Sequence, residues 1–137
     1  VMAGSDIVAL DATGRPRLDG LSFAQTVAAL REDSTLVMAD CGSFEDAQRA
    51  VDAGVDIVST TLAGYTGDRV KTDGPDLELL REVVAAFPDV PVICEGRVHT
   101  PEQAAAAVEA GAFAVIVGTA ITHPTSITTW FKAAVEG

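Results

Sequence analysis

Short apolar runs and amphipathic stretches alternate along the chain. Three segments, 3–10, 53–60 and 110–117, share one pattern: Ala-Gly, a short step, and then a run of mostly β-branched apolar residues. Glycine in that place is typical of a helix end, because the missing Cβ permits the left-handed backbone conformation. The runs are strand-length and do not alternate with polar residues, which indicates parallel strands covered on both faces.

Amphipathic patterns fill the intervals between these runs. In the segment 76–87, apolar residues recur at three- and four-residue steps and form one stripe. Pro75 is expected in the first turn of that helix, where its missing N–H costs nothing. Thr100 is predicted to cap the following helix, with Pro101 at its first position and Gln103 completing a capping box.

These patterns predict five β/α units within a single domain, residues 1–137. Strict alternation specifies a parallel α/β sheet. The widest connection, 63–76, is polar and glycine-rich, and it is a candidate lid. Strands are expected at 6–11, 35–40, 55–61, 90–95 and 114–118, and helices near 21–31 and at 44–53, 76–87, 101–110 and 126–136.

Two architectures compete, an open doubly wound sheet and part of a (β/α)₈ TIM barrel. The glycine fingerprint of dinucleotide-binding sheets is absent from the first strand–helix turn, which favours the barrel. A complete barrel needs about 250 residues, so we expect only about five of its eight units, with two open edges and an exposed core face. Residues 1–4 read as the tail of a preceding helix. The strand ends, which would converge at one mouth, carry Asp11, Asp40, Thr60, Thr61, Glu95, Gly118 and Thr119.

Charge and composition exclude several partners. The chain has 20 acidic and 9 basic residues, a formal net charge of −11, so a nucleic acid would meet a repulsive field. No apolar run is long enough to span a bilayer. Cys41 and Cys94 lack metal-type spacing, as do His99 and His123, so we assign no metal and expect a reducing compartment. These features predict a cytoplasmic protein that binds neither nucleic acid nor membrane.

The strand-end carboxylates are candidates for acid–base chemistry. Glu95 either serves as a general acid or base in a semi-buried mouth or has a structural role, in which it pairs with Arg97, two residues further on, or caps the next helix. Asp40 either faces a ligand or caps the helix after it. Asp11 likewise either faces a ligand or caps a turn with Thr13.

A phosphate site is expected beside them. Gly118 and Thr119 stand at the last strand end, where glycine lets backbone N–H groups approach an anion. In barrels the last two loops commonly bind phosphate. Gly96 and Arg97 stand on the neighbouring strand, and Arg97 would supply bidentate charge-assisted hydrogen bonds.

Longer stretches resemble a known family. The segments "MADCGSFEDAQRAVDAGVDIVSTTLAGYTG", "GPDLELL" and "PVICEGRVHTPEQAAAAVEAGAFAVIVGTAIT" are similar to the N-acetylmannosamine-6-phosphate 2-epimerases, also called N-acylglucosamine-6-phosphate 2-epimerases. The resemblance covers essentially all 137 residues. It implies a (β/α)₈ barrel that interconverts N-acetylmannosamine 6-phosphate and N-acetylglucosamine 6-phosphate during sialic acid breakdown.

The implied chemistry is removal and return of a proton at the carbon that bears the acetamido group. It needs acid–base groups and a phosphate anchor, and no redox cofactor. By motif match, Glu95 takes the place of the family's catalytic glutamate, and Asp40 that of an aspartate that assists at the sugar. The residues expected to contact the phosphate or the rest of the substrate are Gly96, Arg97, Gly118, Thr119, Thr61 and Asp11.

The chain also departs from the family. The family's catalytic lysine lies on a strand before the segment where this chain begins, and neither Lys71 nor Lys132 matches it. His123 stands where relatives often have an arginine, which would weaken phosphate binding. We therefore expect a C-terminal fragment that is inactive alone and is either homo-oligomeric or paired with missing N-terminal units. Two alternatives stay open: another phosphate-binding barrel enzyme, and a non-catalytic half-barrel that serves as an assembly module.

Overall fold

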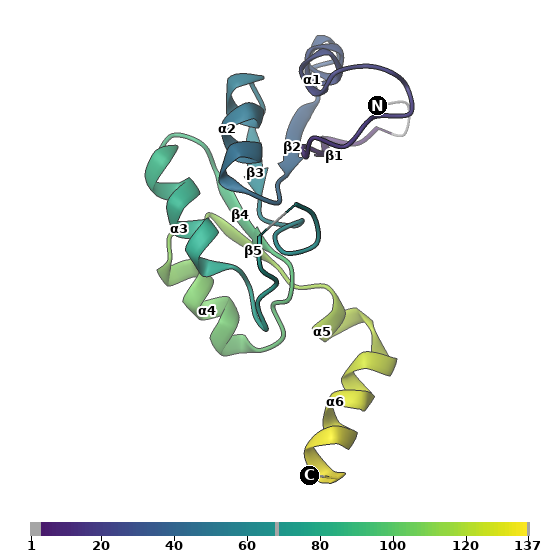
Figure 1. The fold of residues 1–137 in the computed structure, drawn as a ribbon, viewed down its shortest axis with the longest axis vertical. Helices are drawn as coiled ribbons and strands as arrows, with labels where there is room; N and C mark the ends of the chain where they lie inside the picture. The colour runs from purple at the N-terminus through teal and green to yellow at the C-terminus, as the bar shows by residue number, and fades with distance from the viewer. Residues whose placement is uncertain (1–3, 68, 137) are drawn as a thin grey trace.

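Five parallel strands and six helices make up the described part of the chain, which in this computed structural model is residues 4–67 and 69–136. All five predicted β/α units are present (Figure 1). Most of the expected helix end at residues 1–4 lies outside the described residues. The strands are β1 (Ile7–Asp11), β2 (Leu36–Asp40), β3 (Ile57–Ser59), β4 (Val92–Glu95) and β5 (Ala114–Ile116). The helices are α1 (Phe23–Glu32), α2 (Phe44–Asp52), α3 (Leu77–Ala86), α4 (Pro101–Glu109), α5 (Thr119–Thr122) and α6 (Pro124–Glu136).

The strand order distinguishes the two candidate architectures. A doubly wound sheet reverses direction partway through its strand order. Here the order is β1-β2-β3-β4-β5, with each strand beside the next one along the chain, as in a barrel. The predicted parallel (β/α) units of a TIM barrel are confirmed. Because β1 and β5 are the edges of this sheet and do not pair with each other, the barrel is not closed.

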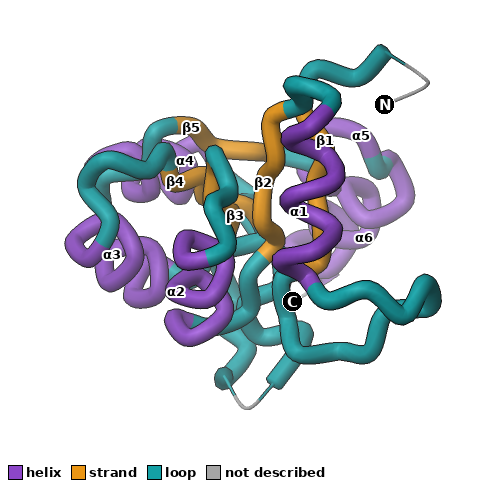
Figure 2. Tube along the Cα trace, turned by 90° about the horizontal axis from the view of Figure 1, so that it is seen from above, coloured by secondary structure: helices purple, strands orange, loops and turns teal. Residues whose placement is uncertain are grey.

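One face of the sheet is covered by α1–α4, which follow one another around the strands (Figure 2). Val37 and Ala39 of β2, and Val58 of β3, point to this side and are completely buried. The other face would line the barrel, and its apolar residues are partly open: Leu36 is 45% exposed and Ile116 is 37% exposed. The exposed core face expected from the sequence is therefore present.

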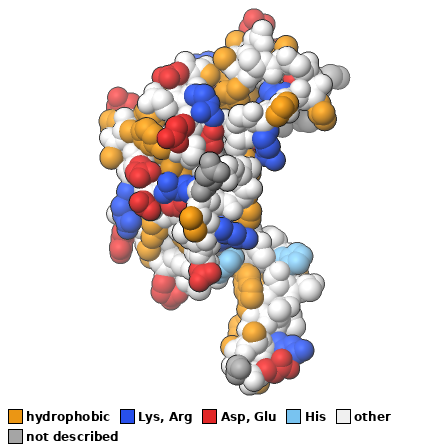
Figure 3. Space-filling model, in the orientation of Figure 1, with side chains coloured by type: hydrophobic (Ala, Val, Ile, Leu, Met, Phe, Trp, Pro, Cys, Tyr) orange, Lys and Arg blue, Asp and Glu red, His pale blue; other side chains and the backbone are white. Residues whose placement is uncertain are grey.

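The C-terminal helices lead away from the sheet (Figure 1). The four-residue helix α5 was not expected, since so short a segment leaves no periodic pattern. No described residue of α6 is buried, and hydrophobic side chains line this arm (Figure 3). Phe131 is 72% exposed. Trp130 contacts the body of the molecule at His99, with ring centroids 4.7 Å apart.

Two helix starts differ from the sequence prediction. Asp76 is the N-cap of α3, so Pro75 precedes the cap and does not lie in the first turn. Thr100 caps α4 as expected, through a hydrogen bond from the Gln103 N–H. The Gln103 side chain, however, accepts from the His99 N–H at 2.7 Å and not from the cap residue. The predicted capping box at α4 is therefore wrong, because the side chain reaches one residue further back.

Candidate active site

Three neighbouring strands end in oxygen-bearing side chains. Asp40 ends β2, Ser59 ends β3 and Glu95 ends β4. The strand register pairs Asp40 with Ser59, and Ser59 with Ile93, so Glu95 lies one pleat further along the same face. Because alternate residues of a strand share a face, all three project from the face that α1–α4 leave uncovered.

Thr61, just beyond the end of β3, joins the two carboxyl groups. Its Oγ1 lies 2.9 Å from Asp40 Oδ1 and 3.0 Å from Glu95 Oε2. The Ser59 hydroxyl is 2.7 Å from the same Thr61 oxygen and 3.4 Å from Glu95 Oε2. Three of the residues singled out from the sequence, Asp40, Thr61 and Glu95, therefore meet in the folded chain.

Thr60 holds the backbone of Glu95 in place. Its Oγ1 donates to the Glu95 carbonyl oxygen at 3.0 Å and accepts from the Glu95 N–H at 3.1 Å. Thr60 is only 2% exposed, so water does not compete for these bonds. The side chain replaces a backbone partner of Glu95 at the point where β3 ends, so the strand expected at 55–61 stops at Ser59. It also begins later than expected, at Ile57.

The surroundings of Asp40 disfavour its ionised form. Burial raises the pKa of Asp40, the hydrogen bond from Thr61 opposes that rise, and the nearby carboxylates of Glu95 and Asp11 add to it. The pKa of Asp40 consequently lies above its ordinary value. A carboxyl group of this kind can donate and recover a proton closer to neutral pH than an exposed aspartate can.

Gly96 and Arg97 form a left-handed turn directly after Glu95. Their φ angles are 100° and 56°, and the second value is uncommon for a residue with a side chain. A Cβ at Gly96 would lie 3.4 Å from the Thr61 carbonyl oxygen. The turn carries the Arg97 guanidinium over the ring of Tyr65, 4.9 Å from its centroid. Among the described residues Arg97 makes no ion pair with Glu95.

The Arg97 side chain binds the connection that was a candidate lid. Its Nε donates to the Gly74 carbonyl oxygen at 3.1 Å, and its Nη1 to the Ala63 carbonyl oxygen at 2.7 Å. Its Nη2 donates to Thr72 Oγ1 at 3.0 Å. A guanidinium carries five N–H bonds, and these contacts use three of them.

A second arginine holds the far end of this connection. Arg69 donates to both carboxylate oxygens of Asp76, at 2.5 Å and 3.1 Å. Asp76 is 4% exposed and also caps α3 through the Leu79 N–H. The connection 63–76 is thus fixed at Arg97 and at the start of α3, and it lies beside the turn that follows Glu95.

Gly118 and Thr119 lie at the far edge of the strand ends. Gly118 precedes α5, and its carbonyl oxygen accepts from the backbone N–H groups of Ile121 and Thr122. A Cβ at Gly118 would meet nothing within 4 Å. The space beside this backbone is therefore open to a ligand, while the first N–H groups of the helix lack partners within it.

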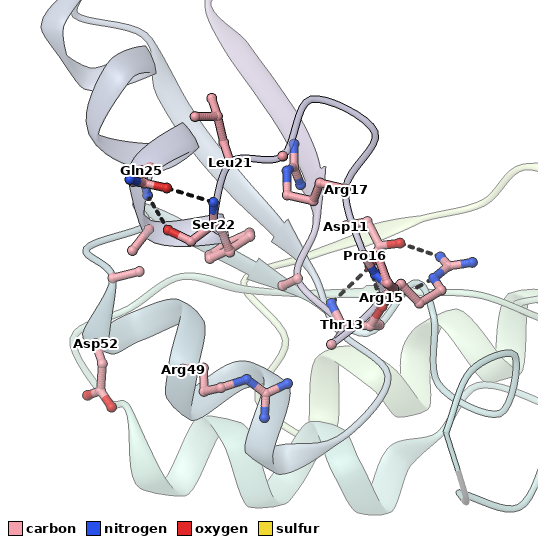
Figure 4. Close-up of a pocket in the computed structure, with 16 residues that line it drawn as sticks. Asp11, Thr13, Arg15, Pro16, Arg17, Leu21, Ser22, Gln25, Arg49 and Asp52 are labelled. Carbon is pink, nitrogen blue, oxygen red and sulfur yellow. Dashed lines mark hydrogen bonds and ion pairs between the residues drawn. The ribbon is translucent and has the colours of Figure 1, made fainter.

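Asp11 ends β1, and neighbouring residues bind its side chain (Figure 4). Its Oδ1 accepts from the Thr13 N–H at 2.9 Å and from the Thr13 hydroxyl at 2.6 Å, while Oδ2 pairs with Arg15. Burial raises the pKa of Asp11, but these hydrogen bonds outweigh it and leave the pKa below its ordinary value. Asp11 also borders a cavity of about 830 Å³ between the loop after β1 and α2, whose lining does not include Asp40 or Glu95.

Sequence reasoning did not assign roles to Ser59 and Thr60. The only signal was the run Ser-Thr-Thr after an apolar strand, which does not reveal the partners of each hydroxyl. Cys41 and Cys94 are buried core residues, and burial raises the pKa of the Cys41 thiol. Within residues 4–67 and 69–136, no cluster of His, Cys, Asp and Glu is arranged to hold a metal ion, and no helix has the length and hydropathy to cross a membrane.

Comparison with known proteins gives consistent matches along the chain. A family model described as "Putative N-acetylmannosamine-6-phosphate epimerase" matches residues 1–137. The "Putative N-acetylmannosamine-6-phosphate 2-epimerase" of Cutibacterium acnes is 58% identical over 136 residues, which are 98% of this chain and 59% of the relative. The protein of the same name from Corynebacterium glutamicum (strain R) is 49% identical over 131 residues, 96% of this chain and 56% of the relative.

A solved structure agrees with these matches. The N-acetylmannosamine-6-phosphate 2-epimerase from Clostridium perfringens is 42% identical, with a TM-score of 0.90. The match covers 94% of this chain and 56% of that one. The present chain therefore spans a little over half the length of each of these three relatives.

Proposed function

The chain belongs to the N-acetylmannosamine-6-phosphate epimerase family, and we propose that its site serves the interconversion of N-acetylmannosamine 6-phosphate and N-acetylglucosamine 6-phosphate. These sugars differ at C2, the carbon that bears the acetamido group and adjoins the latent aldehyde. Epimerisation there removes the C2 proton and returns a proton from the opposite face. The observation that supports this reaction is the meeting of Asp40 and Glu95 at Thr61, since two carboxyl groups provide a base and an acid.

Each carboxyl group has its own part in this proposal. Glu95 exchanges the proton on one face of C2, and an acid–base group of the units that cover the site serves the opposite face. The position of Glu95 is supported by the two hydrogen bonds between its backbone and Thr60. Asp40 donates a proton to the aldehyde oxygen, on which negative charge develops as C2 loses its proton. The raised pKa of Asp40 supports this role, because the group must hold a proton to give one.

The phosphate is proposed to bind at Gly118 and Thr119, with Gly96 and Arg97 on the adjacent strand end. The open space beside Gly118 supports this placement. The two N–H bonds of Arg97 that the loop leaves unused would bind phosphate oxygens. Thr61, through its methyl group, and Asp11 are proposed to contact the remainder of the sugar from the ends of their strands.

Family membership supports further proposals about the protein's setting. We place the reaction in sialic acid breakdown in the cytoplasm, with the phosphorylated amino sugar as the binding partner and no redox cofactor. The inner face of the sheet is open, and proton transfer at C2 needs water to be excluded. We therefore propose that the site works when this face is covered, by a second copy of the chain or by further β/α units.

A chimera tests the proposed activity. This chain would be fused to the part of the Cutibacterium acnes relative that lies outside the match, and interconversion of the two sugar phosphates would be followed by proton NMR. The chimera is expected to turn over both sugars, and the chain alone far more slowly. Thermal-shift measurements with ribulose 5-phosphate and inorganic phosphate would serve as controls. A folded chimera without turnover that is stabilised equally by all of these phosphates would overturn the proposal.

A further inference from the structure

Four oxygen atoms at the strand ends form one hydrogen-bonded group. Thr61 Oγ1 lies 2.9 Å from Asp40 Oδ1, 3.0 Å from Glu95 Oε2 and 2.7 Å from Ser59 Oγ. A fourth contact, of 3.4 Å, joins Ser59 Oγ to Glu95 Oε2. A hydroxyl donates one hydrogen bond and accepts at most two. The two hydroxyl groups thus supply two protons for four contacts.

With both carboxyl groups ionised, one short contact has no proton. The Ser59 hydroxyl donates to Thr61, and the Thr61 hydroxyl donates to Asp40, so the Glu95 oxygen faces the Thr61 oxygen at 3.0 Å with nothing between them. One further proton, on Glu95, fills this contact. Thr61 Oγ1 then accepts from Ser59 and Glu95 and donates to Asp40, which uses the full capacity of a hydroxyl.

A second arrangement, with the proton on Asp40 and not on Glu95, also places a hydrogen in every short contact. A proton on Asp40 is donated to Thr61 Oγ1, and the Thr61 hydroxyl then donates to Glu95. The two arrangements differ by two short proton shifts, one from Glu95 to Thr61 and one from Thr61 to Asp40. The group keeps the same net charge throughout. We infer that Asp40 and Glu95 share one proton through the Thr61 hydroxyl, and that Thr61 passes it between them.

The charges around the pair favour a retained proton. Asp11 lies opposite Asp40 in the register of β1 and β2, and it adds negative charge that its partner Arg15 only partly offsets. On the other side, Ile116 of β5 lies opposite Glu95 and brings no charge. Arg97 follows Glu95, but its guanidinium is bound to the connection 63–76. The raised pKa of Asp40 agrees with this balance.

The shared proton deepens the proposed function and, as a catalytic device, rests on it. In the proposed reaction Glu95 takes the C2 proton while Asp40 gives a proton to the aldehyde oxygen, so each turnover begins with Glu95 ionised and the shared proton on Asp40. The Thr61 hydroxyl can move that proton from Glu95 to Asp40 without a water molecule. Thr61 is on this account a positioning residue that also carries the proton.

Carboxyl carbon NMR on the chain itself tests the inference. Asp and Glu would be labelled with ¹³C, and the signals of Asp40 and Glu95 would be followed from pH 3 to pH 9. In the wild-type chain both signals are expected to show two steps more than about 1 pH unit apart, as in a coupled pair. Thr61→Ser should keep both steps. Thr61→Val should bring the steps closer together and leave each signal with one main step.

The outcomes separate this inference from the proposed function. Single independent steps for both carboxyl groups in the wild-type chain would overturn the shared proton, whether or not the chimera turns over sugars. Two coupled steps in a chimera without turnover would support the shared proton and count against the epimerase proposal. If Thr61→Val fails to fold, Ser59→Ala provides a second test, because it leaves the Asp40–Thr61–Glu95 chain intact and should preserve both steps.

Discussion

Thr60 and Glu95 are joined by two hydrogen bonds that use a single hydroxyl. The Thr60 oxygen donates to the Glu95 carbonyl oxygen at 3.0 Å and accepts from the Glu95 N–H at 3.1 Å. The N–H and the carbonyl oxygen of Glu95, the candidate catalytic residue, are thereby both hydrogen-bonded to a side chain at the end of the neighbouring strand β3. The direction of the Glu95 carboxyl group therefore depends on the identity of residue 60.

Replacing Thr60 by valine should destabilise the fold. Valine has nearly the same shape but no hydroxyl, so it leaves the Glu95 N–H and carbonyl oxygen buried without partners, at a cost of roughly 1–3 kcal/mol. Urea denaturation measures this loss, and Thr60→Ser, which retains the hydroxyl, should recover most of it. Equal stability of Thr60→Val and the wild-type chain would show that the two bonds contribute nothing.

Arg97→Lys should loosen the connection 63–76. Lysine keeps the charge but cannot reach the Gly74 carbonyl, the Ala63 carbonyl and the Thr72 hydroxyl together, because it lacks the planar fork of arginine. Amide hydrogen exchange in this segment should become at least about 10-fold faster. Arg81→Lys on α3 is the matched control and should leave exchange unchanged. Unaltered protection in Arg97→Lys would contradict the assigned contacts.

Asp76→Asn should lower stability at neutral pH and less so in acid. Burial raises the pKa of Asp76, but the hydrogen bonds from Arg69 and the Leu79 N–H outweigh it, so the folded-state pKa lies below 3.8. Such a carboxylate stabilises the fold above its unfolded pKa, and this contribution is lost as the pH falls through the folded value. Asparagine can still cap α3.

Denaturation at two pH values measures this difference. At pH 7 we expect Asp76→Asn to be less stable than wild type by roughly 1–3 kcal/mol, the usual cost of losing a buried charged hydrogen bond. Well below pH 3.8, where Asp76 takes up a proton, the two curves should converge. A difference that stays constant across this range would show that the ion pair with Arg69 is not its source.

Asp40→Asn, by contrast, should raise the stability of the fold at neutral pH. The pKa of Asp40 is raised in the folded state, chiefly by burial, so the fold loses stability as the pH rises from the unfolded pKa through the folded one. At pH 7 the asparagine variant should be more stable than wild type by roughly 0.5–2 kcal/mol, with the difference vanishing in acid. Thermal unfolding at pH 7 checks the sign, and a destabilised variant would contradict it.

Local sequence patterns predicted the units of this fold, and the strand ends predicted that Asp40, Thr61 and Glu95 of the candidate site would lie close together. Three apolar runs were predicted to end at Asp11, Asp40 and Glu95, and β1, β2 and β4 end at these residues. Parallel strands bring such ends to one edge, so the approach of Asp40 and Glu95 followed from the alternation of β and α segments. This part of the site depends on the parallel strands ending at one edge, which the alternation of β and α segments predicts.

The partners of individual side chains could not be predicted in the same way. Arg97 binds carbonyl groups 23 and 34 residues before it, and those contacts exist only after the connection 63–76 has folded over β4. Thr60 and Thr61 are adjacent and chemically identical, yet one serves the backbone of Glu95 and the other its carboxylate. Their partners differ because the two side chains lie on opposite faces of the strand end. Which face each side chain takes depends on where β3 ends.

Exchange of the C2 proton with solvent tests the central claim most directly. The chimera would be incubated with N-acetylglucosamine 6-phosphate in D₂O, and loss of the C2 proton signal would be followed by NMR. We predict deuterium at C2 of both epimers with the wild-type residues, and at least about a 100-fold slower exchange in Glu95→Gln. Wild-type exchange rates in Glu95→Gln would contradict the assignment of proton transfer to this site.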